Sequence, residues 1–75
     1  TLRYDLPQDS HVLITIYDIR GRKVKTLINE NQNAGYRITQ WNATNDFGQP
    51  ISAGMYIYAI KAGDFRTVKK MILLK

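Results

Sequence analysis

Residues 12–17, Val-Leu-Ile-Thr-Ile-Tyr, constrain what this chain can fold into more than any other segment. β-branched and aromatic side chains favour extended backbone over helix, and here they occupy almost every position. Because successive side chains of a strand point to opposite faces, both faces of this segment would be largely apolar. Such a strand is buried on both sides, so we predict that residues 12–17 form a strand in the interior of a sheet.

The remainder of the chain repeats strand signals between turn residues. No window shows the apolar spacing of an amphipathic helix. We therefore predict an all-β fold, an immunoglobulin-like β-sandwich of two antiparallel sheets with about six to seven strands. The predicted strands cover residues 2–6, 12–17, 22–28, 36–41, 55–62 and 65–74.

The segments between these strands carry specific expectations. Gly21 closes a hairpin turn over residues 18–21, and Gly63 begins a two-residue turn. Residues 29–35 are polar and are predicted to be a loop, and residues 42–54 form a long connection. Within the strands, we expect Val24 and Leu27 to point inward. Trp41 lies three residues after Ile38, so the two cannot face one core without a bulge.

The size and composition of the chain limit its function. Its 75 residues are enough for one domain with a thin core, and they are 44% hydrophobic and 23% charged, which argues against disorder. Without cysteine there is no disulfide, thiolate ligand or thiol nucleophile. The longest apolar run, residues 71–74, is too short for a membrane span, and no signal peptide is visible. Because the chain opens at Thr1 directly into a strand pattern, we interpret it as a piece of a larger protein.

Catalytic chemistry has little support. Ser10 and His11 are neighbours, but strand neighbours point to opposite faces and no acid is placed to orient the imidazole. Glu30 stands alone, without a second carboxylate. Asn42, Asn45 and Asp46 supply a single carboxylate, too few for calcium, and suit turns instead. We expect no enzyme activity, catalytic residue, metal or cofactor.

Aromatic and cationic residues each admit two interpretations. Tyr56, Tyr58 and Trp41 could form a sugar-stacking platform, but two-residue spacing beside Ile60 favours a core role. Residues 61–75 contain five Lys or Arg against one Asp and so hold most of the +5 net charge. This hairpin either attracts an anionic partner or protects a sheet edge, and we favour edge protection. No motif indicates nucleic acid binding.

An ordered series of short motifs runs through the chain. It includes Tyr4-Asp5-Leu6-Pro7, Tyr17-Asp18, Asn42 and Lys70-Met71, and its structural signature is Gly21, Gly35, Trp41, Gly48, Gly54, Tyr56 and Tyr58. This series closely resembles the C-terminal sorting domain of proteins exported by the type IX secretion system, and equally the immunoglobulin-like domain of the flagellar hook-capping protein. Two departures are that Ala43 stands where the family often has Gly, and that an upstream Asn-Pro segment is absent.

The resemblance implies a non-enzymatic sorting domain at the C-terminus of a secreted protein, continuous with an N-terminal cargo domain. Its expected partner is the outer-membrane secretion machinery, and its expected location is outside the cell or on its surface, reached through the periplasm. Lys70 and Lys75 are the expected recognition residues. The alternatives are a structural spacer or assembly domain of the hook-capping kind, or a carbohydrate-binding module of a secreted hydrolase.

Overall fold

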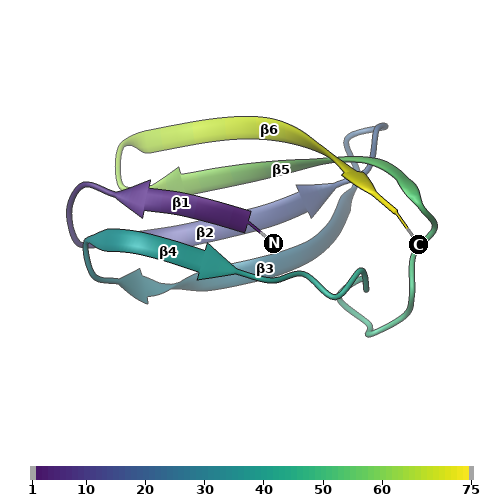
Figure 1. The fold of residues 1–75 in the computed structure, drawn as a ribbon, viewed down its shortest axis with the longest axis horizontal. Coiled ribbons are helices and arrows are strands. Elements are labelled where there is room, and N and C mark those ends of the chain that lie inside the picture. The colour runs from purple at the N-terminus through teal and green to yellow at the C-terminus, as the bar shows by residue number, and fades with distance from the viewer. Residues whose placement is uncertain (1, 75) are drawn as a thin grey trace.

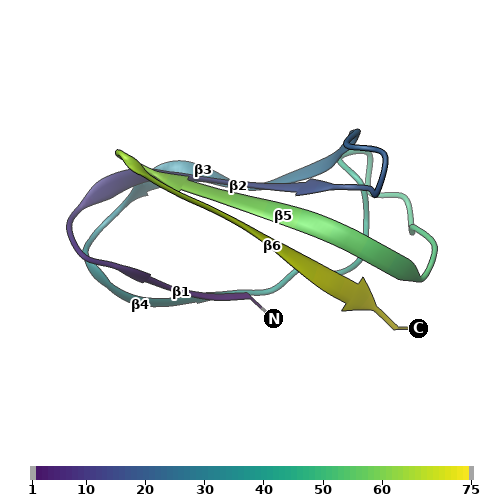
Figure 2. The same ribbon diagram turned by 90° about the horizontal axis from the view of Figure 1, so that it is seen from above.

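The computed structural model describes residues 2–74, which form two antiparallel sheets packed face to face (Figures 1 and 2). One sheet pairs β1 with β4, and the other has the order β3-β2-β5-β6. The predicted all-β fold of two antiparallel sheets is therefore confirmed. The strands are β1 (Leu2–Leu6), β2 (Ser10–Tyr17), β3 (Lys23–Gln32), β4 (Gly35–Thr39), β5 (Gly54–Ala62) and β6 (Phe65–Leu73).

Strand β2 occupies the interior position predicted for it, between β3 and β5. Its side chains Val12, Ile14 and Ile16 are completely inaccessible to solvent. Thr15, on the opposite face, is only 6% exposed. The inner face of β2 is thus fully buried, but burial on both faces, as predicted, is not found: on the outer face Leu13 and Tyr17 are half-buried and His11 is exposed.

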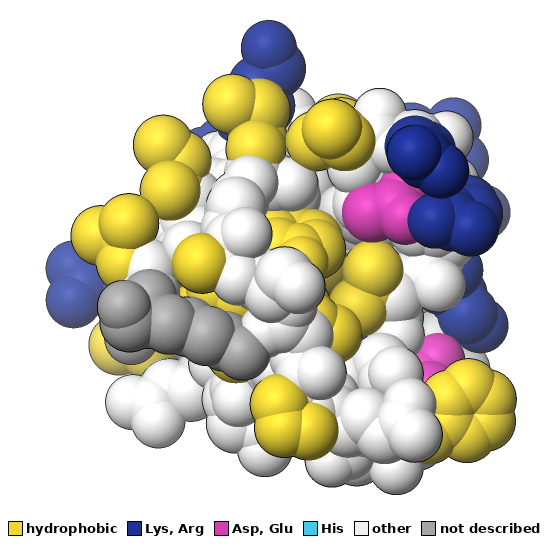
Figure 3. Space-filling view, turned by 90° about the vertical axis from the view of Figure 1, so that its right-hand side faces the viewer, with side chains coloured by type: hydrophobic (Ala, Val, Ile, Leu, Met, Phe, Trp, Pro, Cys, Tyr) yellow, Lys and Arg dark blue, Asp and Glu magenta, His cyan; other side chains and the backbone are white. Residues whose placement is uncertain are grey.

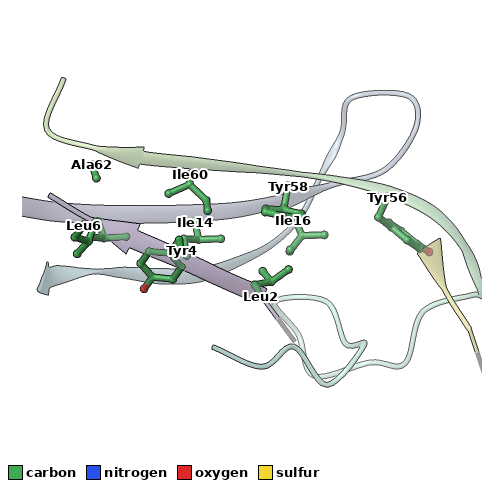
Figure 4. Packing of buried hydrophobic residues seen from close by; sticks show 10 residues of the cluster. Leu2, Tyr4, Leu6, Ile14, Ile16, Tyr56, Tyr58, Ile60 and Ala62 are labelled. Carbon is green, nitrogen blue, oxygen red and sulfur yellow. The ribbon is translucent and has the colours of Figure 1, made fainter. Parts of the chain in front are cut away.

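The core lies where the inner faces of β1, β2 and β5 meet (Figure 4). Alternate residues of each strand point into it, so the period of two in the sequence translates directly into burial. Each buried aliphatic side chain contributes about 1.5–3 kcal/mol relative to an exposed one. The core residues are Leu2, Tyr4 and Leu6 of β1, Val12, Ile14 and Ile16 of β2, and Tyr56, Tyr58, Ile60 and Ala62 of β5.

Strand β3 is longer than predicted, and the loop expected over residues 29–35 is wrong for most of its length. The backbone of β3 continues to Gln32, where it pairs with Ser10 at the start of β2. The polar residues in this segment reflect an exposed end of the sheet rather than a loop. Only residues 33–34 separate β3 from β4, and Asp9 accepts a 2.7 Å hydrogen bond from the Ala34 N–H there.

Two register shifts in the β2–β3 ladder explain how both Val24 and Leu27 contact the core, as predicted. An odd spacing along a regular strand would place them on opposite faces. The shifts lie between Ile14 and Thr15 and between Ile16 and Tyr17. An extra residue on one strand of a pair reverses which face the following side chains occupy.

Strand β4 ends at Thr39, so the predicted strand over residues 36–41 is too long. Ile38 points outward and is 62% exposed, whereas Trp41 lies beyond the strand and packs against the core. The conflict between Ile38 and Trp41 is therefore resolved by the end of the strand and not by a bulge.

Trp41 and Tyr56 fasten the connection between β4 and β5 to the core. Their rings meet edge to face, with centroids 5.6 Å apart and an interplanar angle of 77°. The Trp41 Nε1–H donates a 2.8 Å hydrogen bond to the Thr44 carbonyl, and the Tyr56 hydroxyl donates a 2.7 Å bond to the Ser52 carbonyl. Both aromatic residues thus combine apolar burial with a bond to the connection.

We expect Trp41→Ala and Tyr56→Ala each to lower the free energy of unfolding by about 3–5 kcal/mol, because each removes a large packed ring and a hydrogen bond. Urea denaturation measures the loss. Phe47→Ala is the control, since that ring is 85% exposed and its removal should change stability by less than about 0.5 kcal/mol. Midpoints for the two variants equal to that of the control would contradict the assigned packing.

Candidate functional site

The connection between β4 and β5, residues 40–53, holds most of the polar residues that the sequence offered as a candidate site. Asn45 Oδ1 accepts hydrogen bonds from the backbone N–H groups of Phe47 and Gln49, at 2.9 and 3.0 Å. The Thr44 hydroxyl donates to Asn42 Oδ1 at 2.6 Å. These amide oxygens stabilise the turns of the connection itself, which is the structural role predicted for them.

Asp46 joins the same connection to the edge of β3. Its Oδ1 accepts a 2.9 Å hydrogen bond from the Thr26 N–H, and its own N–H donates to the Val24 carbonyl at 3.1 Å. Lys23 Nζ lies 4.0 Å from the second carboxylate oxygen. Within residues 2–74, no group of three or more His, Cys, Asp or Glu side chains is placed to hold a metal ion. The Asp46 carboxylate therefore acts as an attachment point.

The aromatic residues do not form an exposed platform for a sugar. Tyr56 and Tyr58 are each only 9% exposed and point into the core with Ile60. Trp41 is half-buried, and its ring and that of Tyr56 meet edge to face. Stacking on a sugar needs an open ring face, and neither tyrosine offers one. This favours the predicted core role over the carbohydrate-binding alternative.

His11 lies exposed on β2 opposite two amides of β3. Its Nε2 is 2.7 Å from Asn29 Oδ1, and its Nδ1 is 2.8 Å from Asn31 Oδ1. The hydrogen bonds to Asn29 and then Asn31 raise the pKa of His11 above the usual 6.5, because only the imidazolium donates from both nitrogens. Ser10 instead donates to the Gln8 carbonyl at 3.0 Å. Sequence analysis missed this cluster because it treated Asn29 and Asn31 as loop residues.

The cationic hairpin of β5 and β6 is divided between two faces. The register pairs Lys61 with Arg66 and Ile57 with Lys70, which puts these cations on the outer face of the sheet. Lys69 pairs with Tyr58 and so lies on the inner face. Strand β6 is at the edge of the sheet, and charges at an edge discourage pairing with other strands. Lys75, the second expected recognition residue, lies outside the described residues.

The hydrophobic and cationic side chains also separate at the end of the molecule that carries the long connection (Figure 3). Most Lys and Arg of this face gather at its right-hand side, around an acidic side chain, with others at its top and left edges, and apolar side chains are exposed in patches between them. One acid–base pair in the turn between β2 and β3 is Asp18 with Arg22, at 3.2 Å. The hydrogen bond from the Arg22 backbone N–H is the main cause that lowers the pKa of Asp18.

Comparison with known families identifies the sandwich. The sequence profile described as the FlgD Ig-like domain matches residues 1–64, which include all of β1 to β5. The chain belongs to the FlgD Ig-like domain family. A search among curated proteins and a search among solved structures gave no match. The match supports the resemblance to the hook-capping protein. It provides no support for the resemblance to the type IX sorting domain. Residues 2–74 contain no helix long and apolar enough to cross a membrane.

The signature residues of this FlgD Ig-like domain are structural positions, and the fold brings only its aromatic members together. Gly21 and Gly48 adopt left-handed backbone, with φ of +83° and +76°, in two turns that a larger residue would strain. Gly21 also donates its N–H to the Asp18 carbonyl at 3.0 Å, as the predicted hairpin turn requires. Gly35 and Gly54 begin β4 and β5. These four residues shape the backbone and, as glycines, have no side chain that could contact a ligand.

Ala43, where the resemblance led us to expect glycine, adopts a backbone conformation that favours glycine. Its φ is +62°, the left-handed region that costs a residue with a Cβ atom about 1–2 kcal/mol. The Ala43 carbonyl accepts a 3.1 Å hydrogen bond from the Ile51 N–H, which holds the two ends of the connection together. The connection thus fixes a strained residue at its start.

We expect Ala43→Gly to raise the free energy of unfolding by about 0.5–1 kcal/mol, because relief of the strain exceeds the added entropy of the unfolded chain. Ala53→Gly is the matched control. It lies in the same connection with ordinary backbone, so it should lower stability by about 0.5–1 kcal/mol. Thermal or urea unfolding compares the two, and a loss of stability in both variants would contradict the strain at Ala43.

The pKa of His11 should lie above 6.5 in the folded protein, and Asn29→Ala should bring it back toward that value. Since the folded pKa is raised, the stabilisation by these bonds is present below pH 6.5 and is lost as the pH rises through the folded pKa. NMR titration of the imidazole protons measures both values. A pKa at or below 6.5 in the parent protein would show that the Asn29 and Asn31 oxygens do not face the ring.

Proposed function

We propose that this FlgD Ig-like domain is a structural, non-enzymatic module that spaces or assembles parts of a larger protein. The observation that carries the proposal is that Trp41, Tyr56 and Tyr58 pack in or against the core and hold the long connection to it. These aromatic residues are the ones best suited to bind a ligand, and the fold uses them for packing instead. The family match supports the same role, since the resemblance to the hook-capping protein implies a spacer or assembly domain.

The first and last strands of the described chain lie in different sheets. Strand β1 belongs to the two-stranded sheet and β6 to the four-stranded sheet. Tension applied through the two ends of the described chain therefore loads the packing between the sheets. That packing includes Leu2, Leu6 and Ile14, which are at most 5% exposed.

A sorting function is the second candidate, and one observation favours it. Lys70 lies exposed on the outer face of the edge strand β6, where a partner could reach it. Strand β6 also lies outside the residues that match the FlgD Ig-like domain, so the family does not account for it. In this hypothesis the partner is outer-membrane export machinery, and the protein reaches the cell surface or the medium through the periplasm.

Two measurements on the 75-residue chain test the structural role. In a tandem array pulled by atomic force spectroscopy, each copy should unfold in one step and release at most about 250 Å of chain. Fused to a fluorescent reporter with a secretory signal peptide, in a bacterium that has the type IX system, it should remain in the periplasm. Gradual extension without discrete steps would contradict the structural role.

Surface export of the reporter would favour sorting instead. In that case Lys70→Ala should trap the fusion in the periplasm, whereas Lys61→Ala, which removes another outer-face cation of the same hairpin, should not. Both variants should fold, since loss of an exposed charge changes stability by less than about 0.5 kcal/mol.

A further inference from the structure

The two sheets of the sandwich differ in width, so within residues 2–74 no strand of the smaller sheet lies opposite the inner face of β6. In Figure 1, β1 and β4 lie in front of the lower strands of the four-stranded sheet, and β6 runs above them. Figure 2 shows the end of β6 twisting down toward the layer of β1 and β4. We call the space between the unpaired edges of β1 and β6 the seam.

Two clefts mark the seam. One, of about 250 Å³, has β1 on one side and the second half of β6 on the other. The second, of about 230 Å³, lies between β1 and the first half of β6. The lining of the first includes Leu2, Met71 and Leu73, and that of the second includes Tyr4, Phe65 and Lys69.

The inner face of β6 is apolar at both of its ends. Phe65 shares this face with the buried Ala62 but is itself 48% exposed. Met71 and Leu73 lie on the same face at the other end and are half-buried against the core. Lys69 lies between them and carries the only charge that β6 places on this face. Most of this surface would be removed from water by one more strand in the smaller sheet.

The backbone of β1 is ready to pair with such a strand. Its five residues pair with β4 on one side only within residues 2–74. In an antiparallel pair, alternate residues turn their N–H and C=O groups away from the partner strand. Those groups of β1 point along the sheet plane into the seam, where a strand 4.7–4.9 Å away would bond to them and lie over β6.

We propose that the seam binds an extended segment of a partner polypeptide, which pairs with β1 and covers the inner face of β6. Its inward side chains are apolar and contact Phe65 at one end and Met71 and Leu73 at the other. At the position beside Lys69 it carries an acidic side chain. The proposal deepens the assembly role proposed above, on which it rests, by assigning the surface that a partner would use.

The charge of the seam indicates which side chains a partner segment should carry. Lys69 is the charged side chain that β6 turns toward the seam, whereas Lys70 lies on the outer face of its sheet and Arg3 and Asp5 lie on the exposed face of β1. An acidic residue would offset the charge of Lys69, which otherwise opposes strand addition at this edge. A second copy of the chain is a poor occupant, because each copy has a net charge of +5 and the two would repel.

The test uses the 75-residue protein and two synthetic peptides of eight residues. Both alternate valine or isoleucine with polar residues, and they differ only by glutamate or lysine at the central apolar-face position. The glutamate peptide should bind, slow amide hydrogen exchange in β1 and raise the melting temperature. The lysine peptide should bind at least about tenfold more weakly, the effect expected from reversing one close charge pair.

Two pairs of variants locate the binding surface. Phe65→Ala should weaken binding of the glutamate peptide about tenfold, whereas Phe47→Ala, which removes an exposed ring outside the seam, should not. Lys69→Glu should reverse the preference between the peptides, whereas Lys61→Glu, on the outer face of β5, should preserve it. Urea unfolding confirms that each variant is folded before binding is measured.

Three results would overturn the proposal. The first is that the glutamate peptide does not bind at millimolar concentration. The second is that the peptide slows amide hydrogen exchange at the outer-face residues Ile57, Val68 and Ile72 and not in β1. The third is that exchange in β1 is already slowed by self-association of the protein without peptide. Failure here leaves the force and export measurements unaffected, so it is distinguishable from failure of the structural role. Those measurements can equally fail while the peptide binds.

Discussion

The structure depends on the burial of one face of β2 and β5 against β1. Ile14 and Ile16 have no solvent exposure, and within residues 2–74 the strands that lie over them are the two of the smaller sheet. A domain of this size has a thin core, so few residues supply most of the apolar burial. Large aromatic residues suit this requirement. Tyr4, Tyr56 and Tyr58 each bury most of a ring while their hydroxyl groups stay near the rim of the core, where those of Tyr4 and Tyr56 donate to Gln32 and Ser52.

The long connection is ordered by the same core, although it contributes no strand to either sheet. Trp41 anchors its start to Tyr56, and the isolated bridge between Thr44 and Pro50 closes it upon itself. Asp46 then joins it to β3 through a backbone and a side-chain hydrogen bond. The turn-forming residues are thus fixed by contacts at both ends, which explains how Ala43 is kept in a backbone conformation that it disfavours.

Sequence reasoning succeeded where local pattern and tertiary environment agree. Strand β2 and the turn at Gly21 belong to this group, because alternation and backbone freedom are properties of neighbouring residues. It failed where partners are distant. Asn29 and Asn31 have the composition of a loop, and only pairing with β2 makes them strand residues. Trp41 was assigned to a strand because nothing in its neighbours reveals that β4 ends at Thr39.

The sequence also does not predict how the cations of the β5–β6 hairpin are distributed between the two faces of the sheet. Which of Lys69 and Lys70 faces inward depends on the register of β6 against β5, which a cluster of lysines does not specify.

The edges of the two sheets differ in how they are covered, and this difference bears on function. An open edge is a hazard, and a short chain has few residues with which to cover one. Here the long connection covers part of the β3 edge through Asp46, while no other strand within residues 2–74 pairs with the second edge of β1 or of β6. Among the described residues, the charge of Lys69 protects the seam between these edges: it repels a cationic strand and would be desolvated by an apolar one, whereas an acidic side chain would pair with it. A steric cover would exclude every strand, whereas a charge discriminates among them. The seam is therefore protected from indiscriminate pairing and still open to a partner of complementary charge.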